Sequence, residues 1–474
     1  MTPVPTASPP GASTLGELRA AGYRPVSVRE EIRRNTLAKL AAGAPLVEGV
    51  LGFERTVGPQ LERALIAGHD VILLGERGQA KSRIVRSLVN LLDEWLPVVA
   101  GSEINDDPFA PVSRHARDLV ERHGDDTPIT WVHREDRYGE KLATPDTSIA
   151  DLIGEVDPIK VAEGRYLSDE LTIHYGLVPR TNRGIFAVNE LPDLAERIQV
   201  GLLNVLEERD VQIRGYRVRL PLDVLLMATA NPDDYTSRGR IITPLKDRFG
   251  AQIRTHYPED VATEVAIVRA EAREAKCDGV SLVVPRFIDE IVARTSQAAR
   301  GSARVNQRSG VSVRLSIANR ETLVAAALRR AAHLREVDAA PRVSDLEAVY
   351  ASTLGKIEVE ALEDGEDEEL LGELLDRAVQ QTFRELVPSE HLPEVVGAFA
   401  AGATAEVGPD VPAARYEALL SEIPQLSGVV EALVGEERTP ASTASAVELV
   451  LEGLHLSRRL NKDGVDGTAT YRGR

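Results

Sequence analysis

The fold of this 474-residue chain is indicated most clearly by the stretch Asp70-Val-Ile-Leu-Leu-Gly75-Glu-Arg-Gly78-Gln-Ala80-Lys81-Ser82. Within it, Val71 to Leu74 is a short apolar run that is typical of a buried strand. Beyond the two glycines, apolar residues recur at helical spacing, at Ile84, Val85, Leu88, Leu91 and Leu92. The order of strand, glycine-bearing loop and helix predicts an α/β fold with a binding loop at the carboxyl end of a strand.

The loop carries the residue types of a phosphate-binding site. Gly75 and Gly78 permit tight turns that point successive backbone N–H groups at one anion. Lys81 adds a positive charge, and the Ser82 hydroxyl is a group that Mg²⁺ accepts as a ligand. Ala80 stands where the pattern G-x-x-x-x-G-K-[ST] has its second glycine, and we interpret it as a tolerated variant because alanine is the smallest substitute. The loop predicts binding of a nucleoside triphosphate with Mg²⁺, against the alternative of a chance cluster.

Two later strands also end in polar side chains, which argues against chance. The apolar run from Ile185 to Val188 leads to Asn189 and Glu190, and the run from Val224 to Ala230 leads to Asn231. Open α/β sheets bind ligands at the carboxyl ends of their strands. We therefore expect Glu190 to orient and deprotonate an attacking water, and Asn231 to contact the γ-phosphate or position that water. Asn189 stands where such sites carry an Asp that helps to hold Mg²⁺, so its neutral amide predicts weaker binding of the ion.

The composition narrows the classes of partner. A formal charge of −18 opposes nonspecific binding to nucleic acid, which needs many Lys and Arg contacts with phosphates. Aromatic residues make up 4% of the chain, so platforms for base stacking are scarce. The single cysteine, Cys277, forms no internal disulfide. The sequence has no apolar run long enough to span a bilayer and no signal-peptide pattern at its start, so we expect a cytoplasmic protein.

Shifts in composition predict several segments along the chain. After Tyr257 the pattern becomes helical, and fourteen acidic residues against two basic ones lie between Glu336 and Asp376, a run that we interpret as solvated or disordered. The final Gly/Thr/Arg-rich residues are predicted to fray. The expected segments are a disordered tail at 1–25, a nucleotide-binding α/β domain at 26–257 with an insert at about 138–180 and a hairpin at 210–220, a helical lid domain at 258–356, and an acidic segment with a helical C-terminal region at 357–474.

Taken in order, five motifs resemble those of the AAA+ ATPases, and most of all the clade that contains the magnesium chelatase ATPase subunit and the MoxR-type ATPases. The motifs are Gly75 to Ser82, Asn189-Glu190, Asn231, Pro244 to Phe249 and Ser312 to Arg314. The resemblance covers roughly residues 45 to 355, and the joint order of five motifs is far more specific than any one of them. It implies an AAA+ core with a parallel sheet flanked by helices, followed by an all-helical lid and a helical C-terminal region.

The resemblance also assigns a role to each motif. It implies that Lys81 and Ser82 are the Walker A pair, and that Asn189 and Glu190 lie in Walker B. Asn231 then corresponds to sensor 1. Two arginines complete the set: Arg248 matches the arginine finger that acts on a neighbouring subunit's ATP, and Arg314 matches sensor 2.

The function that this resemblance implies is an ATP hydrolase that forms a ring, expected to be a hexamer, and remodels or activates a protein partner. Family precedent favours a partner with a von Willebrand factor A domain, and metal insertion into a tetrapyrrole is a further option. The insert and the hairpin, with Arg214, Tyr216, Arg217 and Arg219, are expected to contact the partner. The alternatives are a DNA-acting motor, which the acidity disfavours, an activator of an alternative sigma factor, which lacks its Gly-Ala-Phe-Thr-Gly-Ala loop here, and a nucleotide-sensing switch with little turnover.

Overall fold

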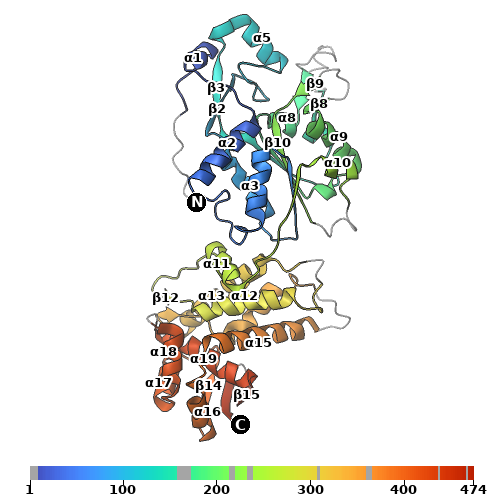
Figure 1. Ribbon diagram of the computed structural model, residues 1–474. Coiled ribbons are helices and arrows are strands. Elements are labelled where there is room, and N and C mark those ends of the chain that lie inside the picture. The colour runs from blue at the N-terminus through green and yellow to red at the C-terminus, as the bar shows by residue number, and fades with distance from the viewer. Residues whose placement is uncertain are drawn as a thin grey trace. The chain divides into compact units, whose positions relative to one another are not determined.

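The computed structural model describes residues 9–156, 172–212, 219–231, 239–306, 310–358, 366–435, 438–465 and 468–474. The chain divides into two compact units, Met1–His256 and Tyr257–Arg474 (Figure 1). Within the ranges just given, every helix is too short or too polar to cross a membrane.

The first unit is built around a five-stranded sheet with the order β11-β1-β10-β7-β4, in which all neighbouring strands are parallel. Its strands are β1 (Val71–Leu74), β4 (Tyr138–Leu142), β7 (Gly184–Asn189), β10 (Val224–Ala230) and β11 (Ala251–Arg254). Successive side chains of β1 enter opposite cores, because Val71 and Leu73 belong to one apolar cluster and Ile72 and Leu74 to the other. The predicted parallel α/β sheet is confirmed.

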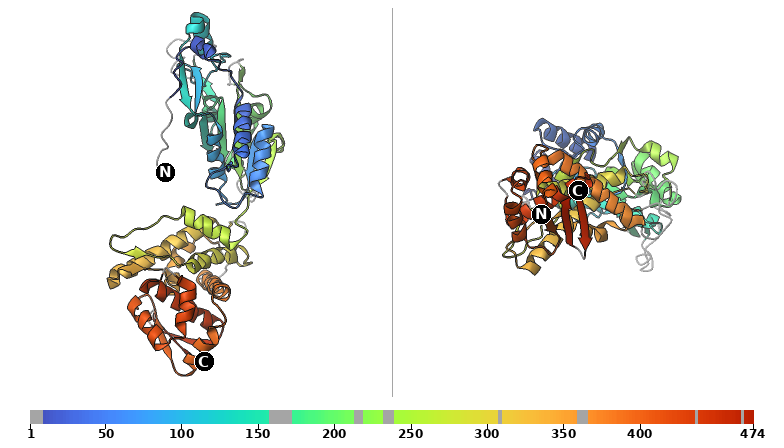
Figure 2. Two further views of the ribbon diagram at one scale, coloured as in Figure 1. Left: turned by 60° about the vertical axis from the view of Figure 1, so that its left-hand side comes forward. Right: turned by 90° about the horizontal axis from the view of Figure 1, so that it is seen from below.

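Helices cover both faces of this sheet. On one face α2 (Val28–Ala41), α3 (Val57–Ala67) and α4 (Lys81–Ser87) contribute side chains to the core, and Figure 2 shows α2 and α3 side by side there. On the other face the core takes side chains from α9 (Glu196–Glu207) and α10 (Thr243–Arg248). A capping box starts α2, because the Ser27 side chain accepts from the Glu30 backbone N–H and the Glu30 carboxylate accepts from the Ser27 backbone N–H.

Part of the predicted N-terminal tail is ordered, and this prediction is wrong for residues after Thr14. Thr14 caps α1 (Leu15–Ala20), and both Leu15 and Leu18 are buried. Two apolar side chains in one short turn are enough to fix the segment, because each buried leucine contributes about 1.5 to 3 kcal/mol. Nearby lie the antiparallel pair β2 (Trp95–Val99) and β3 (Ile129–His133), and the helix α5 (Arg114–His123), which Ser113 caps.

The range predicted as an insert begins differently from the prediction. Its first five residues are the edge strand β4 of the main sheet. The sequence does not indicate this strand, because its charged residues interrupt the apolar pattern of a buried strand. The rest of the insert contains α6 (Ile149–Leu152), β5 (Gly154–Val156), β6 (Ile173–Tyr175) and α8 (Leu177–Arg180). The predicted hairpin has antiparallel stems, β8 (Asp210–Gln212) and β9 (Arg219–Pro221). Its tip, with Arg214, Tyr216 and Arg217, lies outside the described residues.

The second unit is largely helical, and helices from both predicted C-terminal segments share its main core. The helices include α11 (Val261–Glu271), α12 (Arg286–Arg300), α13 (Val313–Leu334), α14 (Tyr350–Thr353), α15 (Glu366–Leu386), α16 (Leu392–Ala400), α17 (Ala413–Glu422), α18 (Leu426–Val434) and α19 (Pro440–Leu456). A short parallel pair joins β12 (Ser281–Leu282) to β13 (Asp338–Ala339). Where the sequence predicts a solvated acidic run, four acidic residues form the first turn of α15, a position that the helix dipole favours.

The last residues of the chain do not fray as predicted. They form an antiparallel sheet with the order β14-β16-β15, from β14 (Thr404–Val407), β16 (Thr468–Gly473) and β15 (Leu460–Val465). The Tyr471 side chain, 2% exposed, anchors β16 in the core and donates its hydroxyl hydrogen to the Glu452 carboxylate. One buried aromatic side chain thus fixes a segment whose other residues are those of a polar tail.

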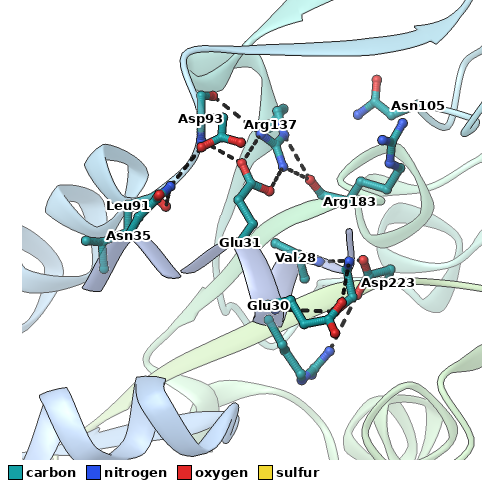
Figure 3. A network of polar contacts seen from close by, with 12 residues as sticks. Val28, Glu30, Glu31, Asn35, Leu91, Asp93, Asn105, Arg137, Arg183 and Asp223 are labelled. Atoms are coloured by element: carbon teal, nitrogen blue, oxygen red, sulfur yellow. Dashed lines mark hydrogen bonds and ion pairs between the residues drawn. The ribbon is translucent and has the colours of Figure 1, made fainter. Parts of the chain in front are cut away.

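A buried ion pair fixes α2 to the sheet (Figure 3). The guanidinium of Arg137, 0% exposed, donates to both carboxylate oxygens of Glu31, at 2.8 and 2.6 Å, and to the Arg183 carbonyl, at 2.9 and 2.6 Å. The Glu31 carboxylate also accepts from the backbone N–H of Asp93 at 2.6 Å. Both charged groups are therefore fully hydrogen-bonded, which is the condition under which burial of an ion pair is tolerated.

We expect Glu31→Gln to lower the free energy of unfolding of the first unit by about 3 kcal/mol or more, because Arg137 would stay buried without a counter-charge. For a unit of this size the loss corresponds to a melting temperature lower by roughly 6 to 12 °C. Thermal unfolding followed by circular dichroism measures it. The matched control is Arg34→Ala, which breaks an exposed ion pair with Asp93 at 2.6 Å and should cost less than about 1 kcal/mol. Equal shifts in the two variants would contradict the anchoring role.

Candidate nucleotide-binding site

The structure brings the polar strand ends together at one edge of the sheet. Strands β1, β10 and β7 are direct neighbours, and they end in the loop from Gly75, in Asn231 and in Asn189-Glu190 respectively. The backbone N–H of Gly75 donates to the carbonyl of Ala230 at 3.0 Å, so the loop begins beside the residue that precedes Asn231. The three motifs that the sequence places at strand ends therefore meet in space.

The conformation of the loop requires glycine at its first position. A Cβ atom on Gly75 would lie 1.9 Å from Oγ1 of Thr255 and 2.2 Å from Oε1 of Gln79. These two side chains are buried and hydrogen-bond each other, with the Thr255 hydroxyl donating to Gln79 Oε1 at 2.7 Å. They hold the loop against β11. The pair has no signal in the sequence, because nothing near Thr255 resembles a motif.

Ala80 adopts a left-handed backbone conformation, with φ 56°. This conformation costs an alanine about 1 to 2 kcal/mol relative to the right-handed one, and glycine adopts it freely. The cost explains why the pattern has glycine at this position. The loop nevertheless keeps its form, with Gly78 also left-handed at φ 76° and α4 beginning at the next residue, Lys81.

Lys81 and Ser82 lie in the first turn of α4. The Lys81 side chain is buried, and its ammonium group donates to the carbonyls of Gly75 and Glu76, the latter at 2.7 Å. These hydrogen bonds hold the ammonium group against the backbone of the loop. Ser82 is half-buried beside it. A curved loop with a lysine against it and a hydroxyl at its end is a donor set that fits a phosphate group and Mg²⁺.

Asn189 is connected to two residues that no sequence motif indicates. Its side-chain amide donates to the carboxylate of Glu140 on β4, and its Oδ1 accepts from the hydroxyl of Thr229 on β10 at 3.3 Å. The Glu140 carboxylate also receives two hydrogen bonds from Arg86 of α4, both at 2.8 Å. These bonds, with those from Tyr138 and Asn189, hold the pKa of Glu140 below its ordinary value even though partial burial opposes the shift. Polar contacts thus link α4, β4, β7 and β10.

Glu190 follows Asn189 in a left-handed conformation, with φ 55°. Its backbone N–H donates to Oγ1 of Thr229 at 3.1 Å. Thr229 thus contacts both predicted Walker B residues from the neighbouring strand, two positions before Asn231, which is buried. The neutral Asn at 189 is the sequence signal that could have prompted a search for a carboxylate on an adjacent strand.

An apolar cavity of about 280 Å³ lies between α4 and the segment from Pro45 to Glu62. Ile84 of α4 forms part of its wall, three residues after Lys81. Phe53, Val57 and Leu61 line it from the segment that ends in α3, and the remaining lining residues include Leu46, Val47, Val50 and Leu51. The cavity has the size and the apolar lining that suit a purine ring.

Arg248 and Arg314 are described in different units. Arg248 ends α10 and pairs with Glu207 of α9, to which its Nε donates at 2.6 Å, and it also donates to the Pro244 carbonyl at 2.9 Å. Arg314 is exposed at the second position of α13, and Ser312 caps that helix. Arg314 therefore lies in the first turn of a helix of the second unit. Its role stays a prediction.

Curated proteins that are similar in sequence to this chain include subunits of magnesium chelatases. No family model matches the chain. The magnesium-chelatase subunit ChlI-1 of Arabidopsis thaliana is 30% identical over 207 residues, which cover 43% of this chain and 46% of the relative. The magnesium-chelatase 38 kDa subunit of Cereibacter sphaeroides is 28% identical over 221 residues, which cover 44% and 58% of the two chains. The chain thus spans about half the length of the curated relatives it matches.

Solved structures give weaker likenesses. A chain from the complex between subunits BchI and BchD of magnesium chelatase aligns with 69% of this chain and 98% of its own length, at 20% identity and a TM-score of 0.35. NtrX from Brucella abortus in complex with ATP aligns with 73% of this chain and 66% of its own, at 15% identity and a TM-score of 0.40. Scores this low leave the assignment to the sequence matches and to the site residues. Over 43 to 44% of its length the chain is similar in sequence to magnesium-chelatase subunits, the likeness that its motifs predicted.

Proposed function

We propose that this chain binds ATP with Mg²⁺ at the joined ends of β1, β7 and β10 and hydrolyses it. The observation that carries the proposal is the meeting of Lys81, Glu190 and Asn231 at the ends of three neighbouring strands. A phosphate-binding cation, a candidate general base and a neutral amide at one edge of a sheet are the groups that transfer of a γ-phosphate to water requires. The apolar cavity beside α4 would take the adenine.

Each residue has a distinct part in this proposal. The backbone of the loop and Lys81 bind the phosphates, and Ser82 and Asn189 are the residues that would hold Mg²⁺. The ion, when bound, neutralises charge on the phosphate oxygens. Glu190 orients the attacking water and accepts its proton, while Asn231 holds the γ-phosphate or that water in place. Arg314 is assigned a part in responding to the nucleotide only by its match to sensor 2.

The work that hydrolysis performs is proposed from the relatives. We infer that the chain forms a ring, taken as a hexamer, in the cytoplasm and acts on a protein partner, for which a von Willebrand factor A domain is the favoured class. The relatives from Arabidopsis thaliana and Cereibacter sphaeroides are subunits of magnesium chelatases, and a subunit works together with other chains, which supports a protein partner here. Identification of the partner would test whether the activity of the complex includes metal insertion into a tetrapyrrole.

The first test is nucleotide binding. We expect Lys81→Ala to weaken the binding of a fluorescent ATP analogue by about 10- to 100-fold, because a charge-assisted hydrogen bond contributes roughly 1.5 to 3 kcal/mol. Fluorescence titration measures it. The control is Lys39→Ala, which removes a lysine that pairs with Glu48 at 3.1 Å away from the loop and should leave affinity unchanged. Equal affinity in the wild type and Lys81→Ala would overturn the assignment of the phosphate site.

A further inference from the structure

The neutral residue at position 189 lies against a carboxylate on the adjacent strand. Strands β4 and β7 are parallel, and Glu140 lies opposite Ala187, two residues before Asn189. Residues two apart on a strand point to the same face, and Ala187 belongs to the core that also contains Ile84 and Val85 of α4. Glu140 and Asn189 therefore share the face that carries Ser82, and their side chains are in hydrogen-bond contact.

Three neighbours keep this carboxylate charged and in one orientation. Arg86, on the same helix as Ser82, donates twice to it, in the bidentate geometry that fixes a carboxylate plane. The Tyr138 hydroxyl donates at 3.1 Å. Asn189 donates from its Nδ2, which leaves its Oδ1 directed to Thr229 and away from Glu140. The orientation of the Asn189 amide is thus set by a negative charge on one side and a hydroxyl donor on the other.

An Asp at position 189 would not fit beside this carboxylate without cost. Two carboxylates within hydrogen-bond distance repel each other unless they share a proton. An Asn next to a Glu carries the same formal charge as an Asp next to a neutral residue. The substitution at 189 and the presence of Glu140 are therefore complementary, since the charge is present and lies one strand away.

We propose that Glu140 supplies the negative charge that Walker B lacks for binding Mg²⁺, and acts as a positioning residue that fixes the orientation of the Asn189 amide. The inference rests on the proposed function, because it concerns the ion that accompanies ATP there. It changes the expectation from the sequence: Asn189 does not by itself make the Mg²⁺ site weak. The rival explanation is that Glu140 only ties β4 to α4 through Arg86.

The test measures the Mg²⁺ concentration at which a fluorescent ATP analogue reaches half of its Mg²⁺-dependent tightening, a readout independent of turnover. We expect Glu140→Gln, which keeps the shape and removes the charge, to raise this concentration by about 10-fold or more, as loss of groups behind a metal ligand does. The double variant Asn189→Asp with Glu140→Gln moves the charge onto position 189 and should restore the wild-type concentration to within about threefold. Glu196→Gln, the same chemical change at an exposed residue of α9 that pairs with Arg240, is the matched control and should shift nothing.

The outcomes separate this inference from the proposed function. If the wild type binds the analogue with a Mg²⁺ dependence that Glu140→Gln leaves unchanged, the inference is wrong and the proposed function stands. If Glu140→Gln shifts the dependence and the double variant fails to restore it, although its melting temperature equals that of the wild type, the group acts through structure alone and the inference is again wrong. If the wild type binds no nucleotide, the proposed function itself fails. Restoration by the double variant supports the relocated charge, because that variant still lacks the ion pair between Arg86 and position 140.

Discussion

Arg248→Ala is expected to lower ATP turnover of the assembled protein by about 10³- to 10⁵-fold, the range that an arginine finger contributes. The described contacts of Arg248 are with Glu207 and Pro244, and the side chain is 30% exposed. Part of the guanidinium surface is thus open to solvent at the end of α10. The resemblance assigns it to the ATP of a neighbouring subunit, where its charge would stabilise the transferring phosphoryl group.

Action between subunits predicts complementation. Arg248→Ala subunits keep an intact phosphate site but lack the finger, and Lys81→Ala subunits keep the finger but lack an intact phosphate site. Each variant is therefore expected to be inactive alone. Mixed assemblies contain interfaces that pair the intact site with the intact finger, and we expect these to recover a measurable fraction of wild-type turnover. Phosphate release at varied mixing ratios measures it, with light scattering to establish that mixed oligomers form.

The control for this experiment is Arg240→Ala. Arg240 is an exposed arginine that pairs with Glu196 at 3.6 Å, and its loss should leave turnover unchanged. No recovery in mixtures that demonstrably assemble would mean that Arg248 does not act on a neighbour. Full activity of Arg248→Ala by itself would remove the finger assignment altogether.

The strand ends of the site could be predicted because their signals are local. The apolar runs predicted at Val71 to Leu74 and Val224 to Ala230 coincide with β1 and β10, and the run before Asn189 lies within β7. Each is buried on both faces, so its sequence is almost continuously apolar, and the apolar run ends abruptly at a glycine or a polar residue. A parallel sheet then brings such ends to one edge whatever the order of its strands.

Glu140 could not be predicted in the same way. Its strand lies at the edge of the sheet and carries Gly139, Glu140 and Lys141, so it has the composition of a loop. Its contact with Asn189 also depends on the order of the strands, which joins residues 49 positions apart. Only the departure at 189 from the family pattern marks the place where a second carboxylate is needed.

The predictions of disorder at the two ends of the chain were wrong for a related reason. The segment of α1 and the strand β16 are short and polar in composition, and each is fixed by one or two buried side chains: Leu15 and Leu18 in the first case and Tyr471 in the second. One partner of β16 is the adjacent strand β15. Its other partner, β14, lies more than sixty positions earlier in the chain, where Thr404 pairs with Arg472. Local periodicity carries no information about a partner so far away.

Glu190→Gln is expected to bind ATP with wild-type affinity and to hydrolyse it about 10² to 10⁴ times more slowly, because an amide cannot take a proton from the attacking water. The backbone of Glu190 is fixed in its left-handed conformation by the hydrogen bond to Thr229, so the change alters chemistry at one side chain and leaves the strand end in place. Single-turnover hydrolysis and equilibrium binding, measured on the same preparation, separate the two effects. Glu196→Gln, on the exposed first turn of α9, is the control and should change neither. Wild-type turnover in Glu190→Gln would show that another group is the base. A wild type that binds ATP tightly, assembles and turns over no faster than this variant would instead favour the nucleotide-sensing switch, in which the same strand ends bind the γ-phosphate and the chain responds to its presence without removing it.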